Sequence, residues 1–506
     1  MSLEKAPARS PSVLAMLAAA RRASLLGALR VLALIAWRPM AAWLAGKMLL
    51  ERVVRPARGM LGRAALRALV TLPLYMAFCA PRLSYRLARV LLRKLCGVRL
   101  ELAHAGRSVR PGVYFQKGGR ADALTIAAGL KNLQAEYWSP MLNGDWSSVV
   151  PSVAHMISSA PPSTETTTRT RRVLMPSSVG ADGDEFVTDW TFPAQKRKGG
   201  GVCVLFAGVG GDSSSGYVQD VSKAFLLRGW TTCCINARGT KSSPRVRRLE
   251  NIFNPYDSSD LETVLDSILR GGERQETAET VVGDNVNLRR KPENQVDIIL
   301  IGFSLGAISL GKYMTSRGPM VPDNVRAAIM FSGAFSMEFA EWWRYREVFQ
   351  PMIVSQLVSD FGEKYGKDLE RKFSKQQLLK AGTASTYRTL VSDLLLPAMR
   401  KTDPDADVDA STRSYEAFQD SGKSSSADRA RISRPTLLVT AIDDPLHNPE
   451  MLGFSTSNPV ESPNLAYMIT EEGGHVGWPT DVGGGSAFMR KTALSFAEAA
   501  CAQKSV

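Results

Sequence analysis

The chain is 506 residues long, with a formal net charge of +15, 44% hydrophobic and 22% charged residues. These proportions are typical of a globular protein with room for one large domain and a sizeable extra region. The six cysteines form no CxxC pair, and the four histidines do not cluster with cysteines or acids at metal-ligand spacing. The sequence therefore predicts no structural disulfide, no metal site and no cofactor.

The first region, residues 1–110, contains 20 Lys and Arg against three Glu, a net charge of +17, so the rest of the chain is nearly neutral. Since no nucleic-acid-binding motif accompanies the charge, we expect no nucleic-acid partner. Apolar runs such as 68–81 fall short of the ~18–20 uninterrupted residues of a spanning helix. Regularly spaced arginines, with Trp37 and Trp43 among them, favour helices lying on an anionic membrane surface.

This N-terminal region predicts an intracellular, membrane-associated protein, at the endoplasmic reticulum or a similar membrane. The alternative is a mitochondrial or plastid transit peptide, because the region is rich in Arg and Ala and poor in acids. A soluble helical extension is a third possibility. Residues 111–170 are then predicted to be ordered loop and linker, with Trp138 and Trp146 as packing anchors and a Pro/Ser/Thr-rich end.

Strands and helices alternate over residues 171–335, which we interpret as the first part of an α/β core. The alternation predicts a mainly parallel sheet with helices on both faces. The polar segment 271–295 lacks a core pattern and is predicted to be a surface insertion. The expected strands are 172–175, 185–192, 201–206, 230–236, 297–303 and 325–331, and the expected helices are 217–228, 260–269 and 305–316.

The alternation stops after residue 335 for about a hundred residues. Residues 336–430 have a helical pattern, and their position between two strands of the sheet predicts a helical cap over the site. A helical decoration unrelated to substrate is the alternative. The core resumes over 431–506, with expected strands at 436–441 and 464–470 and a final helix at 487–500.

The most informative motif is Gly-Phe-Ser-Leu-Gly at residues 302–306, which follows a short aliphatic run and precedes a helical segment. In a strand–turn–helix context, the two glycines allow a turn that lifts the serine hydroxyl above the sheet. The motif therefore predicts that Ser304 is a nucleophile. A solvent-exposed serine in a glycine-rich turn is the alternative interpretation.

A serine nucleophile needs a base, which in this motif context follows it in the order Ser, acid, His. His475, in a glycine-flanked loop after the last predicted strand, is the predicted base. His447 lies only three residues beyond the acid candidates, so it is the weaker choice. For the acid that orients the histidine, we favour Asp444 over the alternative Asp443, because Asp444 better matches the expected spacing from the strand end.

The developing oxyanion needs two backbone N–H donors. One is expected from Leu305, directly after the nucleophile, and the other from the loop 207–212, where we predict Val209. An ordinary connector or a phosphate-binding loop is the alternative for this segment. Because no Gly-Lys-Ser/Thr follows, a nucleotide site is not expected.

Together these motifs resemble the α/β-hydrolase superfamily, over about residues 130–500. More narrowly, they resemble the membrane-anchored abhydrolase-domain lipases and esterases, which include yeast medium-chain fatty acid ethyl ester synthase/esterases and animal phospholipase-type enzymes. The motifs that carry the resemblance are 302–306, Asn-Ala-Arg-Gly at 236–239, 243–244, 256–262, 443–445, 473–477 and, more loosely, 414–418. The resemblance implies an α/β-hydrolase fold with a mainly parallel, eight-stranded-type sheet and a helical cap.

The resemblance also implies a serine hydrolase that cleaves carboxylic esters, with acyl lipids as the expected substrates. Acyl transfer to an alcohol and a non-catalytic binding role are the alternatives, and the oligomeric state stays open. Two departures from the family pattern stand out. Ala207 replaces the histidine that usually supports the oxyanion loop, and Asp481 lies one residue too far from His475 for the His-x-x-x-x-Asp pattern of some acyltransferases.

Overall fold

The computed structural model describes residues 109–137, 139, 169–179, 183–195, 201–240, 242–270, 296–335, 350–400, 413–447, 460–480 and 486–503. The predictions for the basic N-terminal region, for Trp138 and Trp146 and for the polar segment 271–295 lie outside these residues. Among the helices of the described part, none has the length and apolarity needed to cross a membrane.

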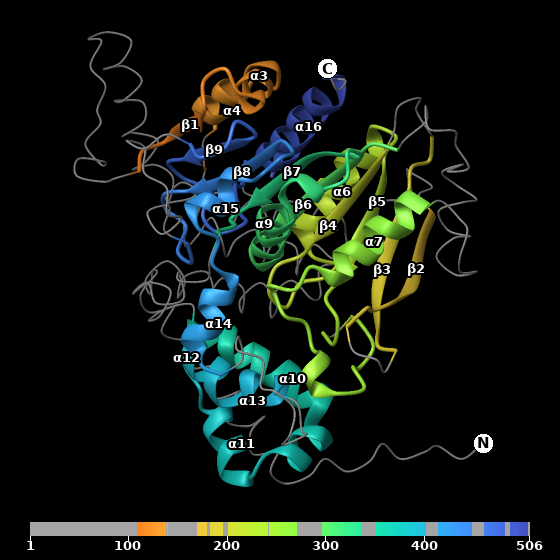
Figure 1. Cartoon of the computed structure of the whole chain (residues 1–506), viewed down its shortest axis with the longest axis vertical. Helices are drawn as coiled ribbons and strands as arrows, with labels where there is room; N and C mark the ends of the chain where they lie inside the picture. Colours follow the sequence, from red (N-terminus) through yellow and green to blue (C-terminus); the bar gives the residue numbers. More distant parts are fainter. Residues whose placement is uncertain are drawn as a thin grey trace, which may run out of the picture.

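The core is one nine-stranded sheet with the strand order β1-β9-β8-β7-β6-β4-β5-β3-β2 (Figure 1). The six strands from β9 to β5 are parallel to one another, whereas β1 pairs antiparallel with β9, and β3 and β2 continue the other edge by antiparallel pairing. The mainly parallel sheet is as predicted. The strands are β1 (Gly112–Phe115), β2 (Arg169–Pro176), β3 (Glu185–Phe192), β4 (Val202–Phe206), β5 (Thr231–Asn236), β6 (Ile298–Phe303), β7 (Val325–Phe331), β8 (Thr436–Ala441) and β9 (Leu465–Thr470).

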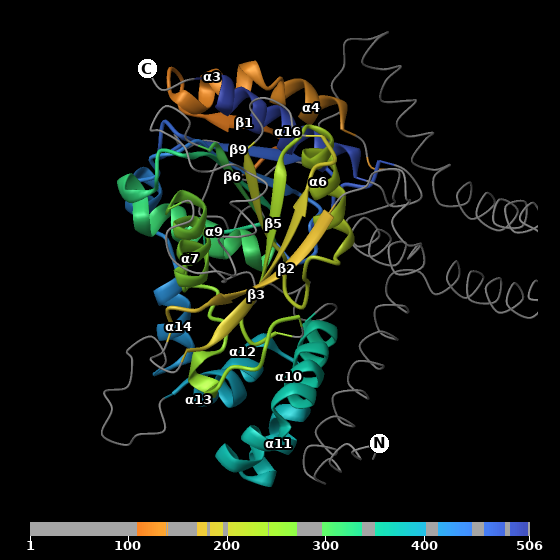
Figure 2. The ribbon, with the colours of Figure 1, turned by 90° about the vertical axis from the view of Figure 1, so that its right-hand side faces the viewer.

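Helices cover both faces of this sheet (Figures 1 and 2). Residues of α3, α4, α6 and α16 pack in one apolar cluster with the strand side chains of one face. Residues of α7 and α9 pack in a second cluster with the strand side chains of the other face. Because both faces are covered, β4, β5, β6, β8 and β9 are buried throughout. These helices are α3 (Arg120–Ala127), α4 (Leu130–Glu136), α6 (Gly216–Leu227), α7 (Ser259–Arg270), α9 (Leu305–Arg317) and α16 (Ala487–Ala502).

The strand β1, which brings the sheet from the expected eight strands to nine, lies in the segment that the sequence predicted to be loop and linker. There, β1 pairs antiparallel with β9, and α3 and α4 follow it. The prediction missed these elements because β1 has only four residues, all half-buried, and therefore shows no alternation of apolar and polar side chains. The short helices bury few residues, chiefly Ala121, Leu124 and Leu130.

A group of helices separates β7 from β8, and α10 to α14 of this group lie beyond one end of the sheet, whereas α15 lies beside α9 (Figure 1). The apolar side chains of this group are continuous with one of the two core clusters. Tyr365 of the longest helix ties the group to the loop after β5: its hydroxyl donates to Gly239 O (3.0 Å) and accepts from Val246 N (3.2 Å). The helical elements are α10 (Gln350–Lys372), α11 (Lys375–Gly382), α12 (Tyr387–Leu390), a π-helical turn (Val391–Leu395), α13 (Leu396–Met399), α14 (Tyr415–Gly422) and α15 (Ser426–Ala430).

Candidate active site

Ser304 occupies a strained turn between β6 and α9, with φ 52° and ψ −117°. A side chain at either flanking glycine would collide with backbone: a Cβ on Gly302 would lie 2.6 Å from Ala307 Cα, and one on Gly306 would lie 2.5 Å from Ala207 O. A non-glycine residue in such a conformation costs on the order of 1–3 kcal/mol and is held by its surroundings. Here the Ser304 amide donates to Phe331 O at 2.9 Å.

The structure brings Ser304, His475 and Asp444 together. The carboxyl ends of the parallel strands β6, β8 and β9 meet at one edge of the sheet, and each of these residues follows one of them. His475 Nε2 lies 2.7 Å from Ser304 Oγ, and His475 Nδ1 lies 3.0 and 3.1 Å from the two carboxylate oxygens of Asp444. This series of hydrogen bonds runs in the order that transfers a proton away from the serine.

The Asp444 carboxylate is completely buried and is held by the backbone. Its Oδ1 accepts from the amides of Leu446 (2.8 Å) and His447 (2.9 Å). Burial acts to raise the pKa of Asp444, but the charge and hydrogen bond of His475, together with His447, outweigh it and lower the pKa below its ordinary value. The group is therefore an ionised carboxylate facing the imidazole.

The alternative acid, Asp443, contacts the same loop in a different way. Its Oδ1 accepts from the amide of Gly474 at 2.8 Å, beside His475 rather than on its ring. The structure thus places Asp444 on the imidazole and Asp443 on the backbone that carries it. Gly474 has φ 65°, which a glycine adopts without strain.

His447 is buried beside the candidate base, with ring centroids 4.9 Å apart and an interplanar angle of 80°. Burial, with the neighbouring His475, lowers the pKa of His447 to about 3. It is therefore neutral at physiological pH. One potential ligand atom from each of Asp444, His447 and His475 lies within 4.8 Å of the other two, and this is the one group of potential metal ligands found in the described part of the chain.

The two predicted oxyanion donors lie in the wall of a cavity of about 180 Å³. Val209 is in the loop after β4 and is 37% exposed, and Leu305 is the first residue of α9, where an amide has no partner within the helix. The loop passes close to the serine, since a Cβ on Gly208 would lie 3.1 Å from Ser304 Cβ. Both residues therefore lie at the cavity wall, and the loop that carries Val209 passes beside Ser304.

The rest of the cavity wall is largely apolar and comes from two parts of the chain. Ile252, Phe253 and Pro255 contribute from the loop region after β5, and Lys364 and Asp360 are its charged side chains on α10. Burial lowers the pKa of Lys364 to about 8. The remaining apolar lining on the helical side is Leu357, Phe361, Tyr387, Val391, Leu395, Leu396, Met399 and Phe418.

Two residues near Ser304, Ser332 and Tyr217, were not predicted from the sequence to support the site. Ser332, at the end of β7 with φ 47°, accepts from the amide of Val476 at 2.9 Å and so holds the loop that carries His475. Tyr217 accepts from the amide of Gly208 at 3.0 Å. The position of Ser332, directly after a strand adjacent to the nucleophile strand, was a usable signal, whereas Tyr217 resembled any aromatic residue in the first turn of a helix.

Comparison with known proteins agrees with this architecture. The profile of the family described as alpha/beta hydrolase fold matches residues 202–480, more than half of the chain. This chain belongs to the alpha/beta hydrolase fold family, and the fold predicted from the sequence is confirmed.

Individual relatives are distant. The chain is 24% identical over 304 residues to a protein of Escherichia coli (strain K12) named "Putative esterase YheT". This match covers 59% of this chain and 76% of that protein. It is also 24% identical over 283 residues to the embryogenesis-associated protein EMB8 of Picea glauca, covering 55% of this chain and 53% of that one. Among solved structures, the Pyrococcus furiosus esterase Pf2001 aligns over 61% of this chain and 85% of its own, with 13% identity and a TM-score of 0.34.

Proposed function

We propose that this protein is a serine hydrolase that cleaves carboxylic esters. The observation that carries the proposal is the hydrogen-bonded series from Ser304 through His475 to the buried Asp444, built on a strained turn at the edge of the sheet. A histidine in contact with a serine hydroxyl, and oriented by a carboxylate, is the arrangement that activates a serine at neutral pH. The name of the Escherichia coli relative, an esterase, supports the same reaction.

In the proposed mechanism, Ser304 Oγ attacks the ester carbonyl while His475 Nε2 takes its proton. Asp444 keeps the imidazole in the tautomer whose Nδ1 carries a hydrogen and stabilises the imidazolium. The amides of Leu305 and Val209 hold the oxyanion, each contributing on the order of 2.7–4 kcal/mol in the transition state. His475 then gives its proton to the leaving alcohol, and water hydrolyses the acyl-enzyme.

The cavity supports an acyl lipid as the substrate. Its wall is mainly apolar, and residues of the helical group between β7 and β8 form one side of it, which is the place proposed for a cap. The basic N-terminal region would bring the enzyme to an anionic membrane, at the endoplasmic reticulum or a similar organelle. This would place the protein with the membrane-anchored lipases and esterases of its family. Cleavage of the region as a transit peptide is the alternative.

A panel of p-nitrophenyl esters of increasing acyl length tests this function in the purified protein. We expect hydrolysis of wild-type protein to rise with acyl length until the cavity is filled, and to be lost in Ser304→Ala. The same assay with an added short alcohol separates hydrolysis from acyl transfer, since transfer would yield a new ester. If folded wild-type protein hydrolysed none of the esters, the proposal would be wrong and a binding role would take its place.

A further inference from the structure

The loop between β4 and α6, residues 207–215, must hold the Val209 amide in place although its first five residues, 207–211, carry no polar side chain. Its sequence is Ala-Gly-Val-Gly-Gly-Asp followed by three serines, and Ala207 has no polar group. Gly210 has φ 66°. A glycine-rich loop of this kind has many accessible conformations, so a fixed oxyanion donor requires contacts from neighbouring elements.

At the start of the loop, such a contact comes from Tyr217 in the first turn of α6. Its hydroxyl oxygen accepts from the amide of Gly208 at 3.0 Å, and its ring lies 4.9 Å, centroid to centroid, from that of Phe303, directly before the nucleophile. Burial raises the pKa of Tyr217, so the hydroxyl stays protonated. The bond occupies the Gly208 amide, which leaves the next amide, that of Val209, as the donor at the cavity wall.

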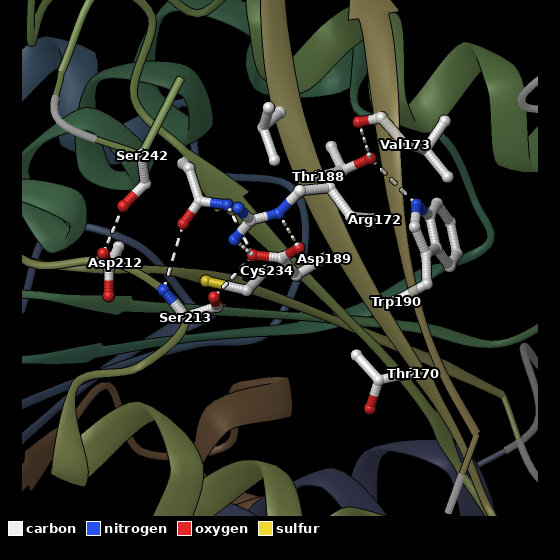
Figure 3. A network of polar contacts seen from close by, with 12 residues as sticks. Thr170, Arg172, Val173, Thr188, Asp189, Trp190, Asp212, Ser213, Cys234 and Ser242 are labelled. Atoms are coloured by element: carbon white, nitrogen blue, oxygen red, sulfur yellow. Dashed lines mark hydrogen bonds and ion pairs between the residues drawn. The ribbon is translucent and has the colours of Figure 1, made fainter. Parts of the chain in front are cut away.

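The far end of the loop is fixed through Ser213 (Figure 3). Its amide donates to Asn236 Oδ1 at 3.0 Å and its hydroxyl donates to Asp189 Oδ2 at 2.5 Å. Asp189 also accepts from Asn236 Nδ2 at 2.9 Å and is paired with Arg172 at 2.7 Å. These partners lie on β2, β3 and β5, so the sheet itself anchors this end, and Tyr217 is the contact that sets the end nearest Ser304.

We propose that Tyr217 is a positioning residue for the oxyanion loop: its hydroxyl holds Gly208 so that the Val209 amide faces the carbonyl attacked by Ser304. This inference rests on the proposed ester hydrolysis. It assigns to a helix side chain the support that Ala207 cannot give. The bound ester has no oxyanion, which develops in the transition state and the tetrahedral intermediate, so substrate binding should not depend on this role.

Two substitutions remove the contact by different routes. Tyr217→Phe deletes the accepting hydroxyl and keeps the ring. Gly211→Ala keeps the tyrosine but places a Cβ 2.5 Å from its hydroxyl oxygen, 3.0 Å from Ser215 Oγ and 3.2 Å from Gly208 O, at a backbone position without a left-handed φ. The matched control is Tyr467→Phe on β9, which removes a buried hydroxyl that donates to Glu461. For each variant, kcat and KM for a p-nitrophenyl ester are measured, together with the Ki of butylboronic acid, whose tetrahedral adduct places an oxygen in the oxyanion site.

The expected result is a fall in kcat of at least tenfold in Tyr217→Phe and in Gly211→Ala, with KM changed less than twofold and Ki raised by the same factor as kcat falls. Tyr467→Phe should keep wild-type kinetics. In the double variant the loss should be smaller than the two single losses combined, because phenylalanine lacks the hydroxyl oxygen, which is the atom nearest to the new Cβ. If one single variant folded poorly, the fall in kcat and the rise in Ki of the other would still test the contact.

Three results would overturn the inference: wild-type kcat in folded Tyr217→Phe, additive losses in the double variant, or an equal loss in Tyr467→Phe. Wild-type protein that neither turned over the ester nor bound the boronic acid would instead overturn the proposed hydrolysis, and this inference with it. The two failures are therefore distinguishable.

Discussion

At the level of single residues, the two adjacent aspartates after β8 have separate roles in the proposed active site. Asp444 bonds the ring of His475, whereas Asp443 bonds the amide of Gly474. Both carboxylates contact the loop that carries His475, but only that of Asp444 contacts the imidazole ring.

We expect Asp444→Asn to lower kcat by about 10⁴, as an amide at this position favours the wrong histidine tautomer. Asp443→Asn keeps an oxygen for the Gly474 amide and should lower kcat less than tenfold. Steady-state kinetics of both variants on one p-nitrophenyl ester make the comparison. Equal losses would mean that the site needs the pair of carboxylates rather than an oriented histidine.

The lowered pKa of His447 predicts that the folded protein loses stability in acid. Its pKa is about 3 in the folded protein against an ordinary value of 6.5, so between these values the unfolded chain binds the extra proton. The stability from burying neutral His447 is therefore fully present above pH 6.5 and is lost as the pH falls from 6.5 toward 3. At about 1.4 kcal/mol per pKa unit, the effect amounts to a few kcal/mol.

Urea denaturation at pH 7.5 and pH 4.5 tests this prediction. His447→Gln should lose less of its free energy of unfolding between the two pH values than wild type does. Asp444, with its lowered pKa, adds a loss at lower pH that both proteins share. The idea fails if both proteins lose the same amount over the interval.

At the scale of elements, the buried guanidinium of Arg238 joins the end of β5 to α7 and to the turn after β2. It donates to Asp260 Oδ1, Ser177 Oγ and Asn251 O, each at 2.6 Å, and is 1% exposed. Burial outweighs the Arg238 charge and raises the pKa of Asp260. The cluster fixes the start of the loop that meets α10.

Removing Arg238 leaves the buried Asp260 without its ion-pair partner. Arg238→Met should therefore lower the free energy of unfolding by about 3–5 kcal/mol. The matched control is Arg388→Met, which breaks the exposed pair with Glu416 and should lower the free energy of unfolding far less. Chemical denaturation measures both. Similar costs for the two variants would show that the buried cluster contributes no more than a surface ion pair.

Most elements of the core were predictable because their sequence signals are local. The strand Val325–Phe331 and the strand Thr436–Ala441 have the predicted bounds, since continuous apolar runs mark buried parallel strands. The spacing of Ser304, Asp444 and His475 from strand ends was equally readable. The contact of Tyr217 with Gly208 was not, because nothing in the sequence indicates which way a loop amide faces. The short strand β1 was missed for lack of pattern.

At the scale of the whole molecule, the uneven charge predicts where the enzyme works. Residues 1–110 hold a net +17, whereas the rest of the chain is nearly neutral. A basic, apolar segment binds anionic lipid through electrostatic attraction and apolar burial together.

We expect the full chain to co-sediment with vesicles containing phosphatidylserine, to bind less at 0.5 M salt because the charges are screened, and to bind little to neutral phosphatidylcholine vesicles. A chain lacking residues 1–108 should stay in the supernatant with all three. Binding that survived the truncation would place the membrane contact elsewhere, and a shortened N-terminus on protein isolated from cells would favour the transit peptide.

Labelling by a fluorophosphonate probe shows whether Ser304 is an activated nucleophile. We expect folded wild-type protein to be labelled, Ser304→Ala and His475→Ala to stay unlabelled, and Asp443→Asn to be labelled like wild type. Absence of labelling in folded wild-type protein, or labelling that survived in Ser304→Ala, would mean that Ser304 is not the activated nucleophile.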